Sequence, residues 1–255
     1  MLERFEYYNA RLCDSLLVAA YNSLPDWADF NGSWPSPAEI MDALPSAVFT
    51  PVEGEQPNPT DSGHLLCRRA RQLLSIQEAN IVAPAAAVSA AAAGTPIVFI
   101  DDFIGSGDQF VKTWTREYIS TGPKSFAEAY ARRPFVAAYI ALVSTKSGLG
   151  HIRLNAPNVA VSVAHVLTED STLSVLLTNR SHPVPHLVKR IKPFLLKYVS
   201  RLSPAEAYMQ SDTYKLLGYK TRALLLAFEH SVPDATLPIF WSPGLNGWQP
   251  LISRA

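Results

Sequence analysis

Apolar runs of strand length alternate with amphipathic stretches of helical spacing through the central part of the chain. Strands are predicted at residues 47–52, 80–84, 97–100, 135–143 and 159–166, and helices between them at 65–74, 109–119 and 126–133. Strands that alternate with helices in this way are typical of βαβ units. The pattern therefore predicts an α/β fold with a parallel, doubly wound sheet.

Helical patterns flank this core on both sides. Residues 1–24 have the spacing of one helix, and Ser36-Pro37-Ala38-Glu39 predicts a capping box at the start of another. Further helices are predicted at 187–199 and from the second capping box, Ser203 to Glu206, before an apolar strand at 222–228. We expect one domain over 1–255, with an N-terminal helical extension (1–46), a core sheet (47–166), a helical insertion (167–220), and a C-terminal strand and hood (221–255).

The candidate chemistry lies where the apolar run Ile97 to Ile100 ends in Asp101 and Asp102. Open α/β sheets bind ligands at the carboxyl ends of their strands, and neighbouring residues of a strand project to opposite faces. Ionised carboxylates only accept hydrogen bonds, so they suit the hydroxyls of a sugar. An alternative is that the acids merely cap the next helix.

A small-residue turn, Gly105-Ser106-Gly107, follows directly and precedes the predicted helix. Glycine lets the backbone turn tightly, and the amides at a helix N-terminus favour an anion. Because the apolar run, the acidic pair and this turn occur together and in order, we favour a binding site for a sugar beside a phosphate.

Bulk properties narrow the class of protein. The 255 residues contain 22 basic and 22 acidic side chains, so no global field attracts DNA, RNA or an anionic membrane. Cys13 and Cys67 are too few for a disulfide framework, and no apolar run reaches the ~20 residues of a membrane span. We expect a cytoplasmic protein without a signal peptide or membrane segment.

The stretch from Ile97 to Gln109 resembles the ribose-phosphate motif of the type I phosphoribosyltransferases. The resemblance implies that Asp101 and Asp102 hold the ribose hydroxyls of phosphoribosyl pyrophosphate. It also implies that the 5′-phosphate is bound by the loop residues Ile104, Gly105, Ser106, Gly107, Asp108 and Gln109. Ser106 stands where threonine is usual, and Gln109 replaces a second hydroxyl residue.

Other parts of the site follow from the same resemblance. Ser62 and Gly63, in the loop just before the first core helix, match the loop that binds pyrophosphate. Mg²⁺ is implied, held mainly by the ligand, with Asp101 and Asp102 nearby. Arg68, Arg69 and Arg71 either reach the diphosphate or form a solvated face, and we favour the solvated face.

The segment from Ala85 to Gly94 is almost entirely alanine. Active members of the family place a mobile loop with polar residues here, whereas this chain offers no acid or base. The segment is predicted to be either a helix or a short lid. Lys146 to Gly150 predicts a turn. His182 and His186 are not expected to bind metal, because the prolines between them exclude a helix that would align them.

The residues from Glu229 to Trp241 and from Trp248 to Arg254 resemble the C-terminal segment of a divergent phosphoribosyltransferase-like group found near prokaryotic conflict and anti-phage systems. Trp241 either stacks on a base or packs in the core. The resemblance implies a neutralising partner, such as a reverse transcriptase with its RNA–DNA product or a helix-turn-helix protein. A homo-oligomer is a further expectation.

These observations predict an enzyme that binds a phosphorylated ribose and transfers it, or cleaves it, at the anomeric carbon, as a toxin or effector of anti-phage defence. The alternative is a non-catalytic sensor or assembly subunit that retains the ribose-phosphate pocket. A nucleic-acid-binding protein is disfavoured, because the net charge is zero and no groove-reading motif is present.

Overall fold

Four strands form the main sheet of the computed structural model, in the order β2-β3-β4-β5. They are β2 (Val48–Pro51), β3 (Ile97–Ile104), β4 (Ala137–Thr145) and β5 (Val159–Leu167). Both β2 and β4 pair with β3 in parallel, with Val48 and Ala137 on either side of Ile97. All nine residues of β4 are buried, as expected for a parallel strand covered on both faces.

The structure describes residues 2–28, 35–54, 61–168, 171–173, 185–204 and 207–253, with only the backbone of 27–28, 185–189 and 207–208. The described chain forms two compact units, where the sequence led us to expect one domain. Residues 11–166 form the first, called here the sheet unit. Residues 1–10 and 167–255 form the second, called here the terminal unit.

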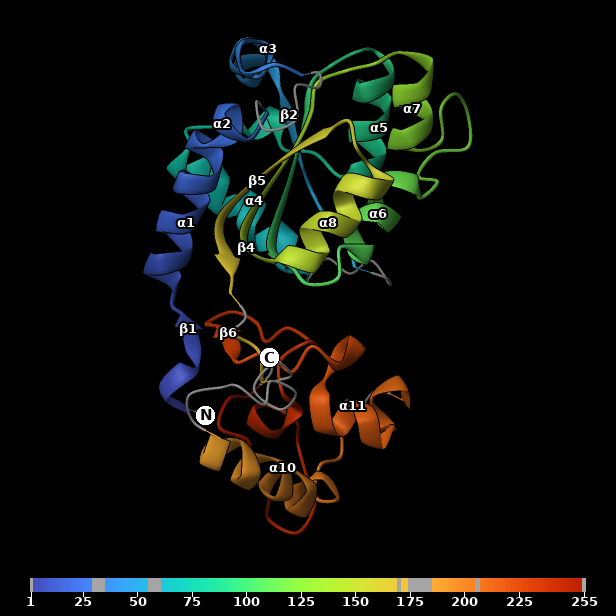
Figure 1. The fold of residues 1–255 in the computed structure, drawn as a ribbon. Coiled ribbons are helices and arrows are strands. Elements are labelled where there is room, and N and C mark those ends of the chain that lie inside the picture. Colours follow the sequence, from blue (N-terminus) through green and yellow to red (C-terminus); the bar gives the residue numbers. More distant parts are fainter. Residues whose placement is uncertain are drawn as a thin grey trace. The chain divides into compact units, whose positions relative to one another are not determined.

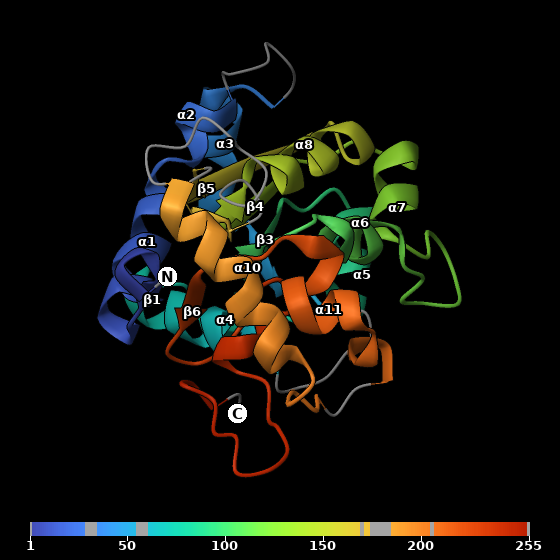
Figure 2. The ribbon, with the colours of Figure 1, turned by 60° about the horizontal axis from the view of Figure 1, so that its bottom comes forward.

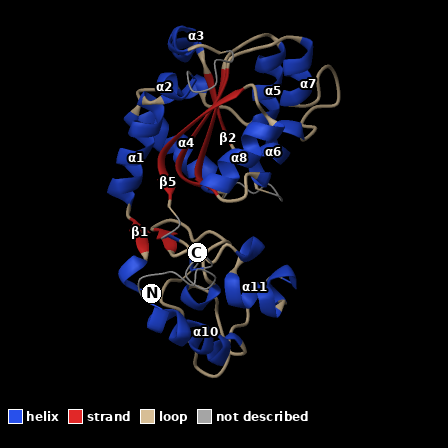
Figure 3. Ribbon diagram, viewed as in Figure 1, coloured by secondary structure: helices blue, strands red, loops and turns tan. Residues whose placement is uncertain are grey.

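Helices cover both faces of the sheet (Figure 1), which confirms the predicted α/β class. One face carries α1 and α4, and the other carries α5 to α8 (Figure 3). The helices of the sheet unit are α1 (Ala10–Asn22), α2 (Leu24–Ala28), α3 (Pro37–Ala43), α4 (Ser62–Leu73), α5 (Pro84–Ala92), α6 (Asp108–Thr115), α7 (Phe126–Arg132) and α8 (Lys146–Asn155), with 3₁₀ turns at Leu44–Ser46 and Glu78–Asn80.

Several predicted helix boundaries are confirmed. The Ser36 capping box forms, since the Ser36 hydroxyl accepts from the Glu39 amide at 3.3 Å and Glu39 accepts from the Ser36 amide at 2.8 Å. Helix α6 starts at Asp108, one residue before the predicted start, and ends at Thr115, four residues early. Its Phe110 and Trp114 face the sheet, where Phe110 stacks on Tyr139 at 4.3 Å between ring centroids.

The predicted strand at 80–84 is wrong. Ile81 makes a single bridge to Phe49, and the chain then enters α5 at Pro84. Proline at the first helical position favours the helix over a strand, and alanine has the highest helix propensity. The alanine segment is therefore a helix rather than a lid, with Ala87, Val88 and Ala91 fully buried in the core.

The predicted turn at Lys146 to Gly150 is also wrong, because these residues begin α8. The hydroxyl of Thr145 caps this helix by accepting from the Gly148 amide at 2.9 Å. Gly148 is required by close packing: a Cβ there would lie 2.5 Å from the Gly105 carbonyl oxygen and 2.9 Å from the Ile104 side chain. Two glycines in a helix suggest a turn, but here packing outweighs propensity.

The terminal unit combines both ends of the chain. Residues 2–9 do not continue the predicted helix: β1 (Glu6–Tyr8) pairs in parallel with β6 (Leu226–Phe228). The unit also contains α10 (Pro185–Val199), α11 (Asp212–Leu217) and 3₁₀ turns at Leu2–Arg4, Ala207–Gln210, Tyr219–Thr221 and Pro238–Phe240. The expected strand at 222–228 is limited to β6. In its core, Phe5 packs edge-on against Phe240 with 4.8 Å between centroids.

Some predictions lie outside the described residues, namely the 182–184 part of the histidine segment, Ala205-Glu206 of the second capping box, and Arg254. Across the described residues, none of the helices has both the length and the apolar character needed to span a membrane.

Replacing Gly148 by alanine tests the packing of α8 against β3. We expect Gly148→Ala to lower the free energy of unfolding by about 1–3 kcal/mol, since its Cβ would overlap the Gly105 carbonyl. Gly150→Ala is the matched control, because nothing lies within 4 Å of a Cβ there, and it should stabilise α8 by about 0.5–1 kcal/mol. Urea denaturation of both variants measures the difference. Equal stabilities would contradict the packing described here.

Candidate functional site

The predicted acidic pair lies near the carboxyl end of β3, beyond the last pairing of β2. Pro51 of β2 pairs with Ile100, whereas β4 accompanies β3 as far as the Ile104–Ser144 pair. Asp101 and Asp102 are therefore the first residues of β3 without a β2 neighbour. Their position fits the general rule that parallel sheets bind ligands at this edge.

The two carboxyls have different partners. Asp101 is 2% exposed and accepts from the Tyr139 hydroxyl at 3.2 Å and from the Asp102 amide at 2.9 Å. Asp102 is 6% exposed and accepts from the Ser62 hydroxyl at 2.9 Å. The structure thus brings the predicted Ser62 to the acidic pair. It adds Tyr139, which the sequence signalled only as a hydroxyl within an apolar strand.

Burial dominates the electrostatics of this edge. Burial and, next, the Asp102 carboxyl raise the pKa of Asp101 well above its ordinary value. Burial and Asp101 likewise raise the pKa of the Tyr139 hydroxyl, and they raise the pKa of Cys67 to about 12. Among the described side chains that shift the pKa of Asp101, no cation is present. The edge therefore favours a ligand that brings hydrogen-bond donors or positive charge.

The glycine turn forms the predicted cradle at the start of α6. Gly107 has φ +83°, which suits glycine, and a Cβ there would lie 2.7 Å from the Gly148 carbonyl oxygen. Within the described residues, the amides of Gly105, Ser106, Gly107 and Gln109 donate to no protein atom. These amides are available to an anion. Ile104 contributes only backbone, because its side chain is buried in the core.

A polar network organises the cradle from within. The Ser106 hydroxyl donates to Asp108 Oδ2 at 2.9 Å, and the Asp108 amide donates to the Ser106 hydroxyl at 3.3 Å. His151 Nε2 on α8 lies 3.2 Å from Asp108 Oδ1. Thr145 donates to the Gly105 carbonyl at 2.5 Å. His151 was missed by sequence reasoning because the start of its helix was predicted to be a turn.

Ser62 and Gly63 begin α4 against the end of β2. A Cβ on Gly63 would lie 2.8 Å from the Val52 carbonyl oxygen and 3.0 Å from Pro51 Cβ. Only glycine allows the helix to start so close to the sheet. This close approach brings the Ser62 hydroxyl within hydrogen-bonding distance of Asp102. The binding of pyrophosphate by Ser62 and Gly63 stays a prediction.

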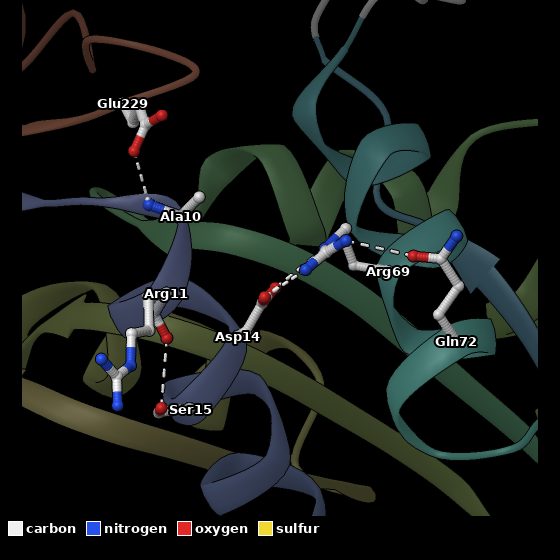
Figure 4. A network of polar contacts seen from close by, with 7 residues as sticks. All are labelled: Ala10, Arg11, Asp14, Ser15, Arg69, Gln72 and Glu229. Carbon is white, nitrogen blue, oxygen red and sulfur yellow. Dashed lines mark hydrogen bonds and ion pairs between the residues drawn. The ribbon is translucent and has the colours of Figure 1, made fainter.

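The arginines of α4 are engaged elsewhere. Arg69 forms an ion pair with Asp14 of α1, with 2.8 Å between Nε and Oδ1, and also contacts Gln72 (Figure 4). Arg71 pairs with Glu78 at 2.8 Å, and Arg68 is exposed. The contacts of Arg69 and Arg71 support the favoured interpretation of a surface face over a diphosphate site.

Trp241 belongs to the terminal unit. It is 3% exposed, packs in a cluster with Met209, Tyr214 and Val232, and donates its indole N–H to the Thr236 carbonyl at 3.1 Å. These contacts are those of a core residue. Its stacking on a base stays a prediction.

A cavity of about 430 Å³ lies elsewhere in the sheet unit, lined by residues that include Trp114, Tyr130 and Asn155. None of the predicted site residues lines it. No group of three or more His, Cys, Asp or Glu side chains in the described part of the chain is placed to hold a metal ion. The acidic edge of β3 and the cradle before α6 therefore form the candidate site.

Comparisons with known proteins identify the family. Two solved structures resemble part of the chain: the AQ2163 protein from Aquifex aeolicus (12% identity, TM-score 0.35) and an orotate phosphoribosyltransferase from Aeropyrum pernix (15%, TM-score 0.30). They cover 64% and 61% of this chain, and 79% and 75% of their own. No curated protein matches. A family model, PRTase-CE, matches residues 1–254. The chain therefore belongs to the PRTase-CE family, in agreement with the phosphoribosyltransferase-like motif at the end of β3.

Proposed function

We propose that this protein binds a ribose 5-phosphate ligand, either phosphoribosyl pyrophosphate or a nucleotide, and transfers or cleaves the phosphoribosyl group at the anomeric carbon. One observation carries the proposal: two buried carboxyls, Asp101 and Asp102, stand directly before a turn whose amides donate to no protein atom among the described residues. Acceptors for sugar hydroxyls and donors for a phosphate are thereby a few residues apart.

The geometry divides the ligand between these groups. The ribose 2′ and 3′ hydroxyls would donate to Asp101 and Asp102, and the 5′-phosphate would accept from the amides of Gly105, Ser106, Gly107 and Gln109. In the transfer step, the bond from the anomeric carbon to its leaving group breaks, and the electron pair leaves with pyrophosphate or the base. A nucleophile then bonds to the same carbon. Buried carboxyls favour the positive charge that develops there, and fixing both ends of the sugar positions it.

Mg²⁺ fits the donor set only as an ion shared with the ligand. The described residues offer two adjacent carboxyls, Asp101 and Asp102, and no third acidic or histidine partner. Mg²⁺ prefers oxygen ligands and is often held by one or two carboxylates together with phosphates and water. The ion would supply charge neutralisation of a diphosphate leaving group.

A second candidate function is a non-catalytic sensor that binds the same ligand. The specific observation in its favour is α5. Where the resemblance would place a polar closing loop, this chain has a helix whose Ala87, Val88 and Ala91 are fully buried. A helix packed in this way supplies neither a mobile lid nor an acid or base.

We further propose that the protein acts in the cytoplasm as a toxin or effector of anti-phage defence. The support is the resemblance of its C-terminal segment to a conflict-associated group, and two buried free cysteines agree with a reducing compartment. A neutralising partner, such as a reverse transcriptase with RNA–DNA or a helix-turn-helix protein, and a homo-oligomeric state belong to the same proposal.

The double variant Asp101→Asn/Asp102→Asn tests the site directly. We expect its affinity for phosphoribosyl pyrophosphate and Mg²⁺ to fall by about 10- to 100-fold, because charge-assisted hydrogen bonds to the ribose are lost. Calorimetric titration measures binding, and pyrophosphate release measures turnover. Asp42→Asn, on the exposed surface of α3, is the matched control. Tight binding by the wild type without turnover supports the sensor, whereas unchanged binding in the double variant excludes both functions.

The raised pKa of Asp101 predicts how stability depends on pH. Because the folded state holds this proton more tightly than the unfolded state, the free energy of unfolding should fall as pH rises from about 4 toward the raised pKa. Asp101→Asn has no proton to lose, so we expect it to exceed the wild type by about 1–2 kcal/mol at pH 8 and to approach it at pH 4. Urea denaturation across this range tests the prediction. A less stable variant at pH 8 would mean that the ionised carboxylate is well solvated.

Asp108 places a negative charge inside the proposed phosphate cradle and holds the Ser106 hydroxyl. Asp108→Asn keeps the shape of the side chain and removes its charge, so ribose 5-phosphate should bind about fivefold more tightly. Unphosphorylated ribose should show no gain. Titration of both ligands distinguishes the outcomes, and equal effects on the two would place the phosphate away from this turn.

A further inference from the structure

The zero net charge of the chain conceals a long basic segment. Residues 171–205 contain six Lys or Arg and no Asp or Glu, in a chain whose totals are 22 and 22. This segment includes α10, which lies in the terminal unit. Positive charge gathered in one segment is the usual electrostatic mark of a surface that meets an anionic partner.

Helix α10 buries one side and exposes the face next to it. Leu195 is 3% exposed in a cluster with Leu225 and Phe240, against which Ile191 and Tyr198 also pack. Arg190, Phe194 and Lys197 are spaced by four and three residues, so they lie on one exposed face of α10, the helix labelled in Figure 2. Arg201 follows four residues later, in the turn after the helix. We call these four residues the α10 stripe.

Aromatic rings adjoin these cations. The Phe194 ring, on a residue that is 43% exposed, lies 5.0 Å from that of Tyr198, which in turn lies 5.7 Å from Trp248. Lys197 Nζ and Arg201 Cζ lie 5.4 and 5.5 Å from the centre of the Tyr198 ring. The surface thus combines cations with an exposed aromatic ring.

The exposed face of α10 carries charges that the helix itself does not balance. Arg190 and Lys197 lie on this face, and α10 contains no acidic residue to offset them. Phe194, on the same face, is 43% exposed. A partner that supplies negative charge and a flat apolar group would complement both features.

We propose that the α10 stripe binds a single-stranded nucleic acid. Arg190, Lys197 and Arg201 contact phosphates, and a base stacks on the Phe194 ring. Aromatic stacking requires an unpaired base, so a single strand uses the whole stripe whereas a duplex uses only its charges. A membrane surface fits less well, because the described apolar side of α10 faces the core and, among its described side chains, Phe194 and Leu196 are the large apolar ones left exposed for insertion. The proposal does not depend on the ribose-phosphate site.

The test uses the full chain with fluorescent oligothymidylate and oligouridylate of 20 nucleotides, each also as a duplex. We expect both single strands to bind at 50 mM salt. Lys197→Gln/Arg201→Gln should weaken binding at least tenfold and reduce the slope of log affinity against log salt by about 1.4, the value for two lost phosphate contacts. Phe194→Ala should weaken single-strand binding at least fivefold and leave duplex binding unchanged.

The control is Arg68→Gln/Arg132→Gln, which removes two exposed cations of the sheet unit and should have no effect beyond about twofold. Thermal unfolding confirms that each variant is folded. The proposal is overturned if the wild type binds no oligonucleotide, if the control weakens binding as much as the stripe variant, or if the protein binds only vesicles containing phosphatidylserine. A difference between the two oligonucleotides would show whether DNA or RNA is the partner.

Discussion

Two adjacent carboxyls are buried at the end of an apolar strand, and the surrounding elements of the sheet unit must supply hydrogen bonds to them. A buried carboxyl is costly unless it is neutral or hydrogen-bonded, and Asp101 and Asp102 obtain their partners from three elements: Tyr139 on β4, Ser62 on α4 and the backbone of β3 itself. The cost that remains appears as the raised pKa of Asp101. Neighbouring structure thus holds in place a pair of acids that would otherwise favour water. Strongly perturbed pKa values of buried carboxyls gather at functional sites, which agrees with this edge as the candidate site.

A second constraint is the close approach of backbones around the cradle. Gly107 faces the Gly148 carbonyl, and Gly148 faces the Gly105 carbonyl, so a Cβ at position 107 or 148 would lie within 3 Å of backbone oxygen. Thr145 adds a hydrogen bond to Gly105 while it caps α8. The shape of the turn before α6 therefore depends on the start of α8, about forty residues later in the sequence.

Local patterns predicted the elements whose sequence and environment agree. The apolar run before Asp101, the start of α6 at Asp108 and the Ser36 capping box were all predicted, since each depends on a few neighbouring residues. The errors occurred where long-range packing decides the structure. Helix α8 contains glycines that serve β3, and Glu6 to Tyr8 become a strand only because Leu226 to Phe228 lie beside them. For the same reason, Ser62 could be predicted as a candidate from the sequence, whereas its contact with Asp102 could not. The contact of His151 with Asp108 could not be predicted either.

The terminal unit shows why total charge is a poor guide to recognition. The zero net charge of the chain disfavours binding of nucleic acid. The net charge does not reveal, however, that residues 171–205 contain no Asp or Glu. Electrostatic attraction between exposed charges acts over about 8 Å at physiological salt, so a partner responds to the charges within that range and not to the total. On α10 that local field coincides with exposed Phe194, and the two features together select for a partner that is both anionic and flat. What matters for recognition is the charge on one exposed side of the molecule. That charge can be assigned only once it is known which side of α10 packs against the core.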